Sequence, residues 1–255
     1  MMIEKYRLER KRHKKKNGTP LTPASINRET AILRKMFNIA IDNNWIDENP
    51  CSAHRVRPLR EESKRERYLE PYEEAQLLAL CKDNLEYMKP ILICALHTGM
   101  RKGEILNLNW NNVDLVNNYI TVRKTKSGKI RKIPLSKTLK THLMKLKNNS
   151  QNEYVFANPQ TGCAYYDLKR SFNTLCKQAG IKGLVFHDLR HTAATRMVAS
   201  GIDLIVVQEI LGHASIQTTQ RYAHPVPERK LEAVKALDNF NKTNKNNIKK
   251  TSHSD

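Results

Sequence analysis

The chain has no long apolar run, no paired-cysteine motif and few acidic residues. No apolar stretch approaches the ~20 residues that a membrane-spanning helix needs. The N-terminal sequence MMIEKYRLER lacks the apolar core of a signal peptide. The five cysteines are odd in number and none are spaced as CxxC, which predicts reduced, mostly buried thiols. These absences indicate a cytoplasmic protein without a membrane partner.

Acidic residues are scarce beside basic ones: Asp+Glu 25 against Lys+Arg 45, a net charge of +20. Such a positive field attracts polyanions, and nucleic acid is the commonest polyanion that a basic protein meets. An anionic membrane would need a basic amphipathic helix or a lipid anchor, and neither is evident in the sequence. The charge therefore favours a nucleic-acid-binding protein, associated with the nucleoid when it binds DNA.

Motifs for nucleotide cofactors and metal ions are also missing. There is no GxxxxGKS/T loop and no GxGxxG, so a nucleotide cofactor has no evident cradle. The sequence HDLRH places His187 and His191 at i and i+4, but it lacks the glutamate of HExxH, and Arg190 between them would oppose a cation. Two-metal nuclease chemistry needs convergent carboxylates, whereas the acidic residues here are scattered. We expect neither a cofactor nor a metal.

Residues 1–62 are predicted to form a partial helical, DNA-binding domain that ends in a linker. The basic segment RLERKRHKKKNGTP ends in a turn, and the polar, Pro-containing segment ENPCSAHRVRPLREESKRER is typical of a linker. Between them, Thr22 and Pro23 predict a helix start. The expected buried face of this helix carries Ile26, Leu33, Phe37 and Ala40, and Met36, Phe37 and Trp45 are expected in the core.

A second domain is predicted over residues 68–240, with a disordered polar tail over residues 241–255. One segment, VDLVNNYITVRKTKSGKIRKIPL, is rich in Val, Ile, Thr and Tyr and is broken at Asn117-Asn118 and Ser127-Gly128, which predicts three short antiparallel strands. The fold class is therefore mainly α with a small three-stranded antiparallel β-sheet. Helices are predicted over LEPYEEAQLLALC, YMKPILICALH, RKGEILNL, 136–147, 165–179, 188–200, 203–211, a short stretch capped by Ser215 that carries Tyr222, and 227–239.

Two arginines and a histidine occupy positions suited to binding an anion. Arg101 follows a Thr-Gly turn at the start of a predicted helix. His187 and Arg190 are three residues apart and so share one face of another helix.

Three further candidates, a lysine, a histidine and a tyrosine, lie near predicted turns or helix ends. Lys126 is at the predicted tip of a strand pair, in a segment, 119–135, with six Lys or Arg and no Asp or Glu. His213 follows Gly212, which is predicted to end a helix, and Tyr222 comes nine positions later. The six candidates include no carboxylate base and no metal-ligand cluster.

This combination suits the in-line attack of a tyrosine on a phosphodiester. Its transition state spreads negative charge over the nonbridging oxygens, to which a guanidinium can donate two hydrogen bonds at once. A histidine can donate or accept a proton near neutrality, and a lysine can protonate the leaving 5′-hydroxyl. A phenol has a pKa of about 10, and neighbouring cations are expected to favour loss of its proton. The phosphotyrosine ester conserves the bond energy, so the reaction needs neither ATP nor metal.

Three sequence blocks resemble, in order and spacing, the signature blocks of the tyrosine recombinase (phage integrase) family: TGMRKGEIL, HDLRHTAATRMVASG and LGHASIQTTQRYAH. The segment KTKSGKIRKIPL resembles that family's lysine-bearing hairpin, and SINRETAILRKMFNIAIDNNWIDENP resembles the end of its core-binding domain. The similarity covers roughly residues 68–240. Members of the family carry a fuller helical domain before the SINRE helix, so we expect this chain to be truncated or a fragment.

The resemblance implies a site-specific recombinase that acts through a covalent 3′-phosphotyrosyl intermediate. Its catalytic set would be Arg101, Lys126, His187, Arg190, His213 and Tyr222. The two arginines would bind the scissile phosphate together with the two histidines. The lysine would be the general acid for the leaving hydroxyl, and the tyrosine would be the nucleophile.

Two supporting residues accompany this set. Glu104, one helical turn after Arg101, would orient that arginine. His191 is expected to face away from the stripe formed by His187 and Arg190, which leaves it a supporting role.

The implied partners are double-stranded DNA, other protomers in a synaptic homo-oligomer, expected to be a tetramer on DNA, and accessory DNA-bending proteins. The predicted helix 227–239 is a candidate for docking on a neighbouring subunit. Candidate DNA contacts come from the basic strand segment and from the first predicted helix. They are Arg34, Lys35, Arg123, Lys124, Lys129 and Arg131.

Three other functions are alternatives to a recombinase. A DNA-binding protein without catalysis would be expected to have lost at least one member of the site. A type IB topoisomerase would share the tyrosine chemistry and differ in needing neither a specific sequence nor a synapse. An RNA-binding module is disfavoured because no aromatic-rich strands offer platforms for base stacking.

Overall fold

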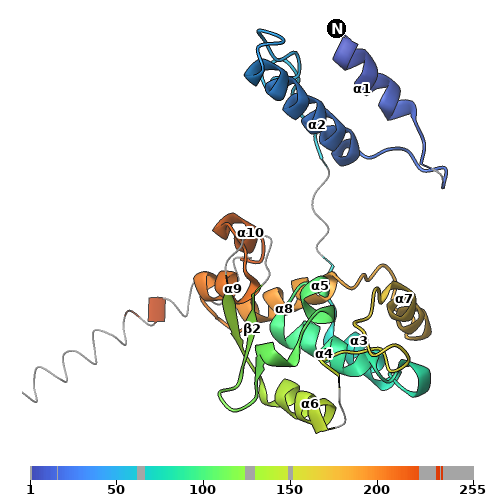
Figure 1. The fold of residues 1–255 in the computed structure, drawn as a ribbon, viewed down its shortest axis with the longest axis vertical. Helices are drawn as coiled ribbons and strands as arrows, with labels where there is room; N and C mark the ends of the chain where they lie inside the picture. The colour runs from blue at the N-terminus through green and yellow to red at the C-terminus, as the bar shows by residue number, and fades with distance from the viewer. Residues whose placement is uncertain are drawn as a thin grey trace, which may run out of the picture. The chain divides into compact units, whose positions relative to one another are not determined.

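The computed structural model describes residues 2–15, 17–61, 67–123, 130–148, 152–223, 234, 235 and 237. The chain divides into two compact units, Met1–Arg65 and Glu66–Asp255, which are described separately below (Figure 1). The predicted tail over residues 241–255 and most of the predicted helix 227–239 lie outside the described residues.

The first unit contains helices α1 (Met2–Arg12) and α2 (Pro23–Asp42). Helix α2 begins where the sequence predicted it, because the side-chain oxygen of Thr22 accepts a hydrogen bond from the backbone N–H of Ser25 at 3.3 Å. A proline at the first helical position has no N–H to leave unsatisfied there. The cap and the proline thus fix the start of the helix.

Helix α1 was not predicted, and contacts with α2 and with the chain after it hold it in place. Glu29 of α2 accepts hydrogen bonds from Arg10 Nε at 2.8 Å and from the hydroxyl of Tyr6 at 3.0 Å. Arg7 is 4% exposed and donates from Nη2 to the carbonyl oxygen of Arg57 at 2.8 Å. The basic composition of this segment suggested a solvated, charged arm. In the structure, Arg7 and Arg10 instead make the hydrogen bonds that hold it as a helix.

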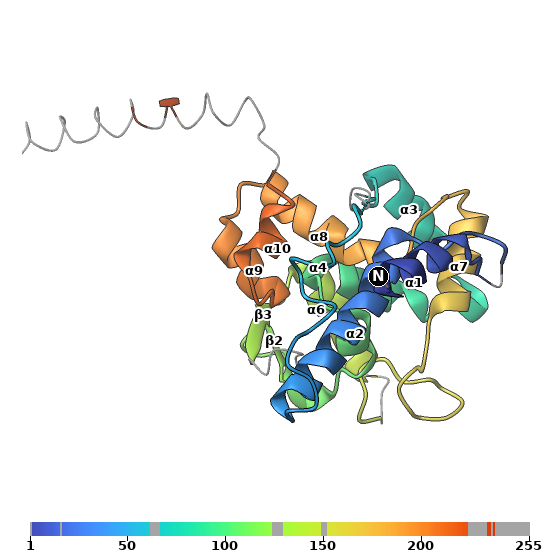
Figure 2. The ribbon, with the colours of Figure 1, turned by 90° about the horizontal axis from the view of Figure 1, so that it is seen from above.

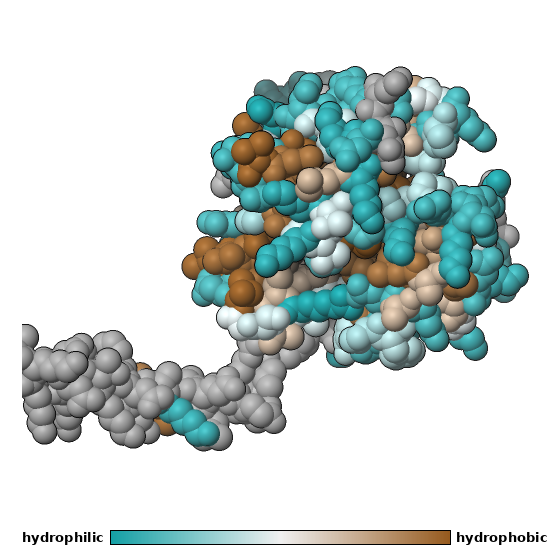
Figure 3. All heavy atoms as spheres, turned by 90° about the horizontal axis from the view of Figure 1, so that it is seen from below, coloured by the Kyte–Doolittle hydropathy of each residue, from teal (hydrophilic) through white to brown (hydrophobic). Residues whose placement is uncertain are grey.

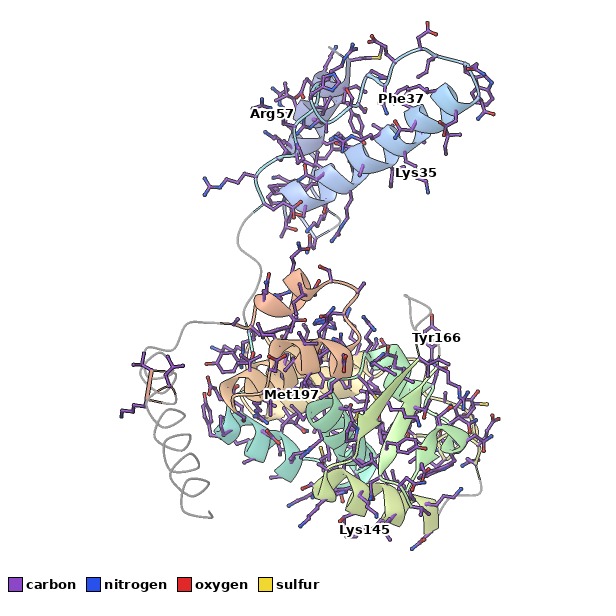
Figure 4. All side chains as sticks on the ribbon, turned by 90° about the vertical axis from the view of Figure 1, so that its left-hand side faces the viewer. Lys35, Phe37, Arg57, Lys145, Tyr166 and Met197 are labelled. Atoms are coloured by element: carbon purple, nitrogen blue, oxygen red, sulfur yellow. The ribbon has the colours of Figure 1, made fainter. Side chains whose placement is uncertain are left out.

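The buried face of α2 is the predicted one. Its fully or partly buried members include Ile26, Leu33, Phe37 and Ala40. Figure 4 shows Lys35 and Phe37 on opposite sides of the helix. The prediction that Met36 and Trp45 belong to the core is wrong, since these side chains are 59% and 75% exposed. Met36 is one position from Phe37, and the helical period turns it away from the buried face.

Helix α4 (Met88–Thr98) is the centre of the second unit. Most of its side chains are buried, and it packs against α5 (Lys102–Leu106), α6 (Lys137–Asn148) and α8 (Asp188–Ala199). Its sequence is apolar on nearly every side, which is typical of a helix surrounded by other elements.

A three-stranded antiparallel sheet lies beside these helices, as predicted. Its strands are β1 (Val113–Asp114), β2 (Tyr119–Val122) and β3 (Arg131–Pro134), in the order β1-β2-β3. Ile120 pairs with Ile133 across β2 and β3, and both side chains are fully buried. Because side chains alternate between the two faces of a strand, this pair fixes which face of the sheet meets the helical core.

The remaining elements are helices α3 (Pro71–Ala79), α7 (Lys169–Gln178), α9 (Leu204–Leu211) and α10 (Ile216–Gln220), with 3-10 turns at Asp83–Leu85 and Trp110–Asn112. Asp203 and Ser215 cap α9 and α10 with their side chains, and Gly212 ends α9 in a left-handed conformation, all as the sequence predicted. Helix α9 packs against α8, α10 and strand β3, and Figures 1 and 2 both show α8, α9 and α10 grouped together.

The surface and the thiols agree with the composition. Figure 3 shows one face of the molecule as largely hydrophilic, with apolar side chains gathered in separate patches. All five cysteines are free thiols and four of them are buried, as predicted. Among the described helices, none has the length and apolar character needed to cross a bilayer.

Gly99 joins α4 to the segment that carries Arg101, and two constraints require a glycine there. Its φ is +62°, in the left-handed region that disfavours side chains. A Cβ at this position would lie 2.4 Å from Cδ2 of Leu211, so α9 closely approaches the end of α4.

We expect Gly99→Ala to lower the free energy of unfolding by about 2–4 kcal/mol, because overpacking adds to the backbone strain. Gly180→Ala is the matched control: Gly180 has a φ of +68° and open space where the Cβ would be, so only the strain of about 1 kcal/mol applies. Urea unfolding followed by Trp110 fluorescence in a Trp45→Phe background would measure both. Equal losses in the two variants would contradict the close approach of α9.

Candidate functional site

Three arginines from different elements meet at the C-terminal end of helix α9. They are Arg131 on β3, Arg190 on α8 and Arg101 just before α5. Arg131 Nε donates to the carbonyl oxygen of Ile210 at 2.9 Å. Arg190 Nη2 donates to that of Leu211 at 2.8 Å, and Arg101 Nη2 to that of Gly212 at 3.1 Å. The last carbonyls of a helix have no partner within the helix and carry partial negative charge, so they can hold cations that would otherwise repel one another.

Arg190 is the most deeply placed of the three, at 4% exposure. Its Nη1 also donates to the carbonyl oxygen of Gly99 at 2.7 Å, so one guanidinium joins the ends of α4 and α9. Burial, followed by the charge of Arg101, lowers the pKa of Arg190 to about 10, which leaves it protonated at neutral pH. A guanidinium has five N–H donors, so these two hydrogen bonds leave others for an anion.

Arg101 is more accessible, and Glu104 orients it. The side chain of Arg101 is 31% exposed, and its Nη1 donates to Glu104 Oε1 at 2.9 Å. The other carboxylate oxygen accepts from the backbone N–H of Arg101 at 2.9 Å. Burial raises the pKa of Glu104, but hydrogen bonds from Arg131 and Arg101 outweigh it and hold this pKa below its ordinary value. The contact expected between Glu104 and Arg101 is therefore present.

Arg131, predicted to contact DNA, is largely enclosed within the protein. Its side chain is only 8% exposed, and Nη1 and Nη2 both donate to the carboxylate of Glu104, at 3.2 and 2.7 Å. Arg131 also fills the space beside Gly212, where a Cβ would lie 2.8 Å from Nη1. Glu104 thus accepts hydrogen bonds from two arginines, and Arg131 is an internal partner of the site.

Tyr222 lies in a turn just after α10, with its ring in an apolar cluster formed mainly by α8 and α9. The cluster contains Ala194, Val198, Val207 and Leu211. The tyrosine is 7% exposed, and its hydroxyl lies 2.5 Å from Nδ1 of His191. Burial raises the pKa of Tyr222 above its ordinary value and outweighs the opposing charges of Arg221 and Arg190. The neighbouring cations thus favour loss of this proton, as expected, but burial has the larger effect in this structure.

His191 does not face away from His187, contrary to the prediction from helical phase. The two rings meet edge to face with centroids 4.9 Å apart, because residues four apart share a helical face. His187 is exposed and His191 is half-buried. Burial and the charge of Arg190 lower the pKa of His187, while burial and the charge of His187 lower that of His191 to about 4.

His213 lies on the other side of the tyrosine. Its ring is nearly parallel to that of Tyr222, with centroids 6.4 Å apart, and its Nδ1 lies 2.9 Å from Oγ1 of Thr219. Burial, followed by the charges of Arg190 and Arg101, lowers its pKa to about 4. His191 and His213 are therefore neutral at neutral pH in this structure.

The structure thus brings together five of the six candidates for the catalytic set: Arg101, His187, Arg190, His213 and Tyr222. The sixth, Lys126, and the candidate DNA contacts Lys124 and Lys129 lie outside the described residues.

The other candidate DNA contacts differ in their accessibility. Arg34 donates from Nε to the carbonyl oxygen of Cys51 at 2.6 Å, so it ties α2 to the chain after it. Lys35 is exposed. Arg123 is exposed and donates to Asn112 at 3.0 Å, and it lines a cleft of about 780 Å³ that also reaches Arg101.

Sequence reasoning missed the pairing of Arg131 with Glu104 and the contact of Thr219 with His213. Arg131 is two residues from Ile133 on the same strand, so the two side chains share the inner face of the sheet, and this period could have indicated burial. Nothing comparable in the sequence indicated the contact of Thr219 with His213. Within the described ranges, no group of three or more His, Cys, Asp or Glu side chains could hold a metal ion.

The fold and the convergence of arginines, histidines and a buried tyrosine define the class of the protein. Residues 67–229 match the family described as the phage integrase family, and the chain belongs to it. It is 29% identical over 217 residues to the integrase of Salmonella phage P22, with 79% of this chain and 54% of that protein covered. It is 34% identical over 237 residues to the integrase of Haemophilus phage HP1, with 91% and 64% covered. The chain thus spans roughly half to two thirds of these relatives.

A solved structure shows the same fold. The Tn1549 transposon integrase in complex with transposon right end DNA superposes with a TM-score of 0.77 at 23% identity, covering 92% of this chain and 84% of that one.

We expect Arg131→Met to lower the free energy of unfolding of the second unit by about 3 kcal/mol at neutral pH. This value is at the low end for breaking a buried ion pair, because Arg101 still pairs with Glu104 in the variant. The wild-type pKa of Glu104 is lowered, so its contribution is present above the ordinary value of about 4.5 and is lost as the pH falls. In the variant this pKa rises, so the deficit should shrink on acidification.

Urea unfolding at neutral pH and near the ordinary pKa of a glutamate would measure the effect. Arg123→Met, at an exposed arginine just after β2, is the control and should change stability by less than about 0.5 kcal/mol. If the two variants were equally stable, the structural role of Arg131 would be wrong.

Proposed function

We propose that this chain carries the catalytic domain of a site-specific DNA recombinase or integrase, which cleaves and rejoins DNA through a covalent 3′-phosphotyrosyl intermediate. One observation carries the proposal: the hydroxyl of Tyr222 lies against His191, in the site where Arg190 and Arg101 are anchored to α9. Membership of the phage integrase family supports it.

The arginines are suited to binding the scissile phosphate. Arg101 and Arg190 are held by main-chain carbonyls and by Glu104, so they need little reorganisation when charge develops on the nonbridging oxygens. Planar guanidinium groups donate paired hydrogen bonds to such oxygens. His187 and His213 would complete the phosphate site as hydrogen-bond donors.

The proposed chemistry has two reversible steps. The oxygen of Tyr222 attacks phosphorus, and the 5′-oxygen leaves with a proton that the family resemblance assigns to Lys126. A 5′-hydroxyl from a second strand then attacks the phosphotyrosine and releases the enzyme. Each step exchanges one phosphoester for another, so neither ATP nor a metal is required in this scheme.

Double-stranded DNA is the proposed partner, in a synaptic assembly of several protomers. The net charge of +20 supports the first part. The Tn1549 integrase structure contains transposon DNA, and another similar solved structure is a lambda integrase dimer bound to a core site. A tetramer on DNA and accessory DNA-bending proteins belong to the same proposal, since strand exchange needs two duplexes.

The protein should form a covalent adduct with DNA, and Tyr222→Phe should form none. The substrate is a library of duplexes nicked at random positions, so that a cleaved end diffuses away and the intermediate is trapped. Adducts are counted as DNA that stays with the protein through boiling in detergent and EDTA. Sequencing the trapped DNA identifies the target.

Three outcomes separate the functions. Wild-type adduct at defined sequences, with none from Tyr222→Phe, supports a site-specific recombinase. Adduct at sites without sequence preference would favour a topoisomerase-like activity. DNA binding without adduct would favour a non-catalytic protein and would overturn the proposal.

DNA affinity should fall steeply with salt, since each phosphate contact releases counterions. Contact with four phosphates predicts a loss of about 50-fold between about 0.1 M and 0.3 M salt. Fluorescence anisotropy with a labelled duplex measures the slope, and the exposed Lys35 offers a test residue. Lys35→Gln should reduce the slope by about one unit if this side chain contacts a phosphate. An affinity independent of salt would rule out phosphate contacts as the main source of binding.

A further inference from the structure

Three histidines surround the tyrosine, and their contacts with it differ. His191 Nδ1 lies 2.5 Å from the tyrosine hydroxyl. His213 faces the ring from the other side and uses its own Nδ1 on Thr219. His187 contacts the ring of His191 and is exposed. Within the described part of the chain, His191 is therefore the histidine in hydrogen-bonding contact with the phenolic oxygen.

Tyr222 is buried, so its phenolic proton needs an acceptor within the protein. The tyrosine is 7% exposed, with its ring in the apolar cluster between α8 and α9. Bulk water has little access to a hydroxyl placed in this way. Attack on phosphorus requires the proton to leave, and an acceptor within hydrogen-bond reach is the first requirement for a general base.

We propose that His191 is a catalytic residue, the general base that takes the phenolic proton of Tyr222 through Nδ1 as the phenolic oxygen attacks phosphorus. This inference rests on the proposed function and names a further residue for the same site. It corrects the supporting role expected from the sequence.

The step balances in protons and bonds. The Oη–P bond forms while the bond from phosphorus to the 5′-oxygen breaks, and the Oη proton moves to Nδ1 of His191. The 5′-oxygen receives a proton from the general acid. When a 5′-hydroxyl later attacks the phosphotyrosine, its proton returns to the general acid that was deprotonated in the first step, and the departing phenolate takes the other proton back from the imidazolium.

Charge in the site sets the timing of this transfer. Burial and the charge of His187 lower the pKa of His191 to about 4, so its ring is unprotonated and able to accept. Burial raises the pKa of Tyr222, so the proton stays on oxygen until DNA arrives. A bound phosphate anion raises the pKa of the histidine, and formation of the Oη–P bond makes the phenolic proton strongly acidic. Transfer therefore accompanies attack and does not precede it.

The charged and titratable groups facing His191 come from two elements. On α8 and at its start they are His187, Asp188 and Arg190, and after α10 they are Arg221 and Tyr222. His213, which follows α9, also senses the charge of His191. A phosphate held by the arginines would offset the positive members of this set.

The test uses the full chain and the DNA site recovered from the adduct experiment, as a nicked duplex in a single-turnover cleavage assay. His191→Asn is the informative variant, because Asn Oδ1 can accept the tyrosine's hydrogen bond in place of Nδ1 but takes up no proton near neutrality. We expect cleavage to slow by about 100-fold or more in His191→Asn and in His191→Ala. A rate for His191→Asn within about threefold of wild type would overturn the proposal and leave His191 a purely positioning role.

His97→Asn is the matched control, since His97 also hydrogen-bonds a hydroxyl through Nδ1, that of Ser136 at 2.9 Å. It should cleave at the wild-type rate. Circular dichroism of each variant establishes that it is folded. Wild-type protein that forms no adduct would count against the proposed function, whereas wild-type adduct together with full activity in His191→Asn counts only against the general base.

The pH profile and the leaving group give two further readouts. Without a base, the cleavage rate of His191→Asn should rise about tenfold per pH unit above neutrality, as hydroxide removes the proton, whereas the wild-type rate should level off. A substrate with sulfur in place of the bridging 5′-oxygen leaves without protonation. It should not rescue His191→Asn, and rescue would place His191 on the leaving-group side and overturn the proposal.

Discussion

The C-terminal end of helix α9 is the feature on which the site depends. Its last carbonyls accept hydrogen bonds from three arginines that come from β3, α8 and the turn before α5. Cations held this close would repel one another, and the partial negative charge of the helix end offsets part of that repulsion. The same contacts join the sheet, the central helices and the segment that leads to Tyr222. The fold and the anion site are therefore stabilised by the same hydrogen bonds.

Glu104 contacts two of the three arginines, and their exposure differs. It accepts hydrogen bonds from Arg131 and Arg101, so one carboxylate neutralises part of the charge and fixes the plane of both groups. Arg131 is enclosed by these contacts, whereas Arg101 keeps a partly exposed side chain. Charged donors on both sides offset the cost of desolvating this carboxylate, so removal of either guanidinium would leave its charge less well compensated. The exposed part of Arg101 then remains available to a phosphate.

The tyrosine and its histidines belong to a second, smaller apolar cluster between α8 and α9. Burial there keeps the phenol and the imidazoles neutral, while the neighbouring arginines stay charged. The site in the absence of DNA thus combines fixed positive charge with neutral proton-transfer groups. An arriving phosphate changes that balance, which couples the proton chemistry to DNA binding in the proposed function.

Several elements could be predicted because local rules decide them. The caps at Thr22, Asp203 and Ser215 and the glycine end of α9 follow from backbone groups that need partners within a few residues. The three strands followed from runs rich in Val, Ile, Thr and Tyr with turn residues between them. The catalytic candidates followed from residue types whose order and spacing resemble a known family. These inferences needed no knowledge of which segments pack together.

The amino-acid sequence alone determined the fold class, the positive charge and the set of side chains proposed to act on a phosphodiester. Tertiary structure alone decided how those side chains are used. Arg131, expected on DNA, is enclosed by Glu104 and the end of α9, and His191, expected to face away, contacts Tyr222. Helix α1 differs from expectation for the same reason, because contacts with distant residues hold it. Exposure, hydrogen-bond partners and pKa depend on segments distant in sequence, and only packing brings these segments together.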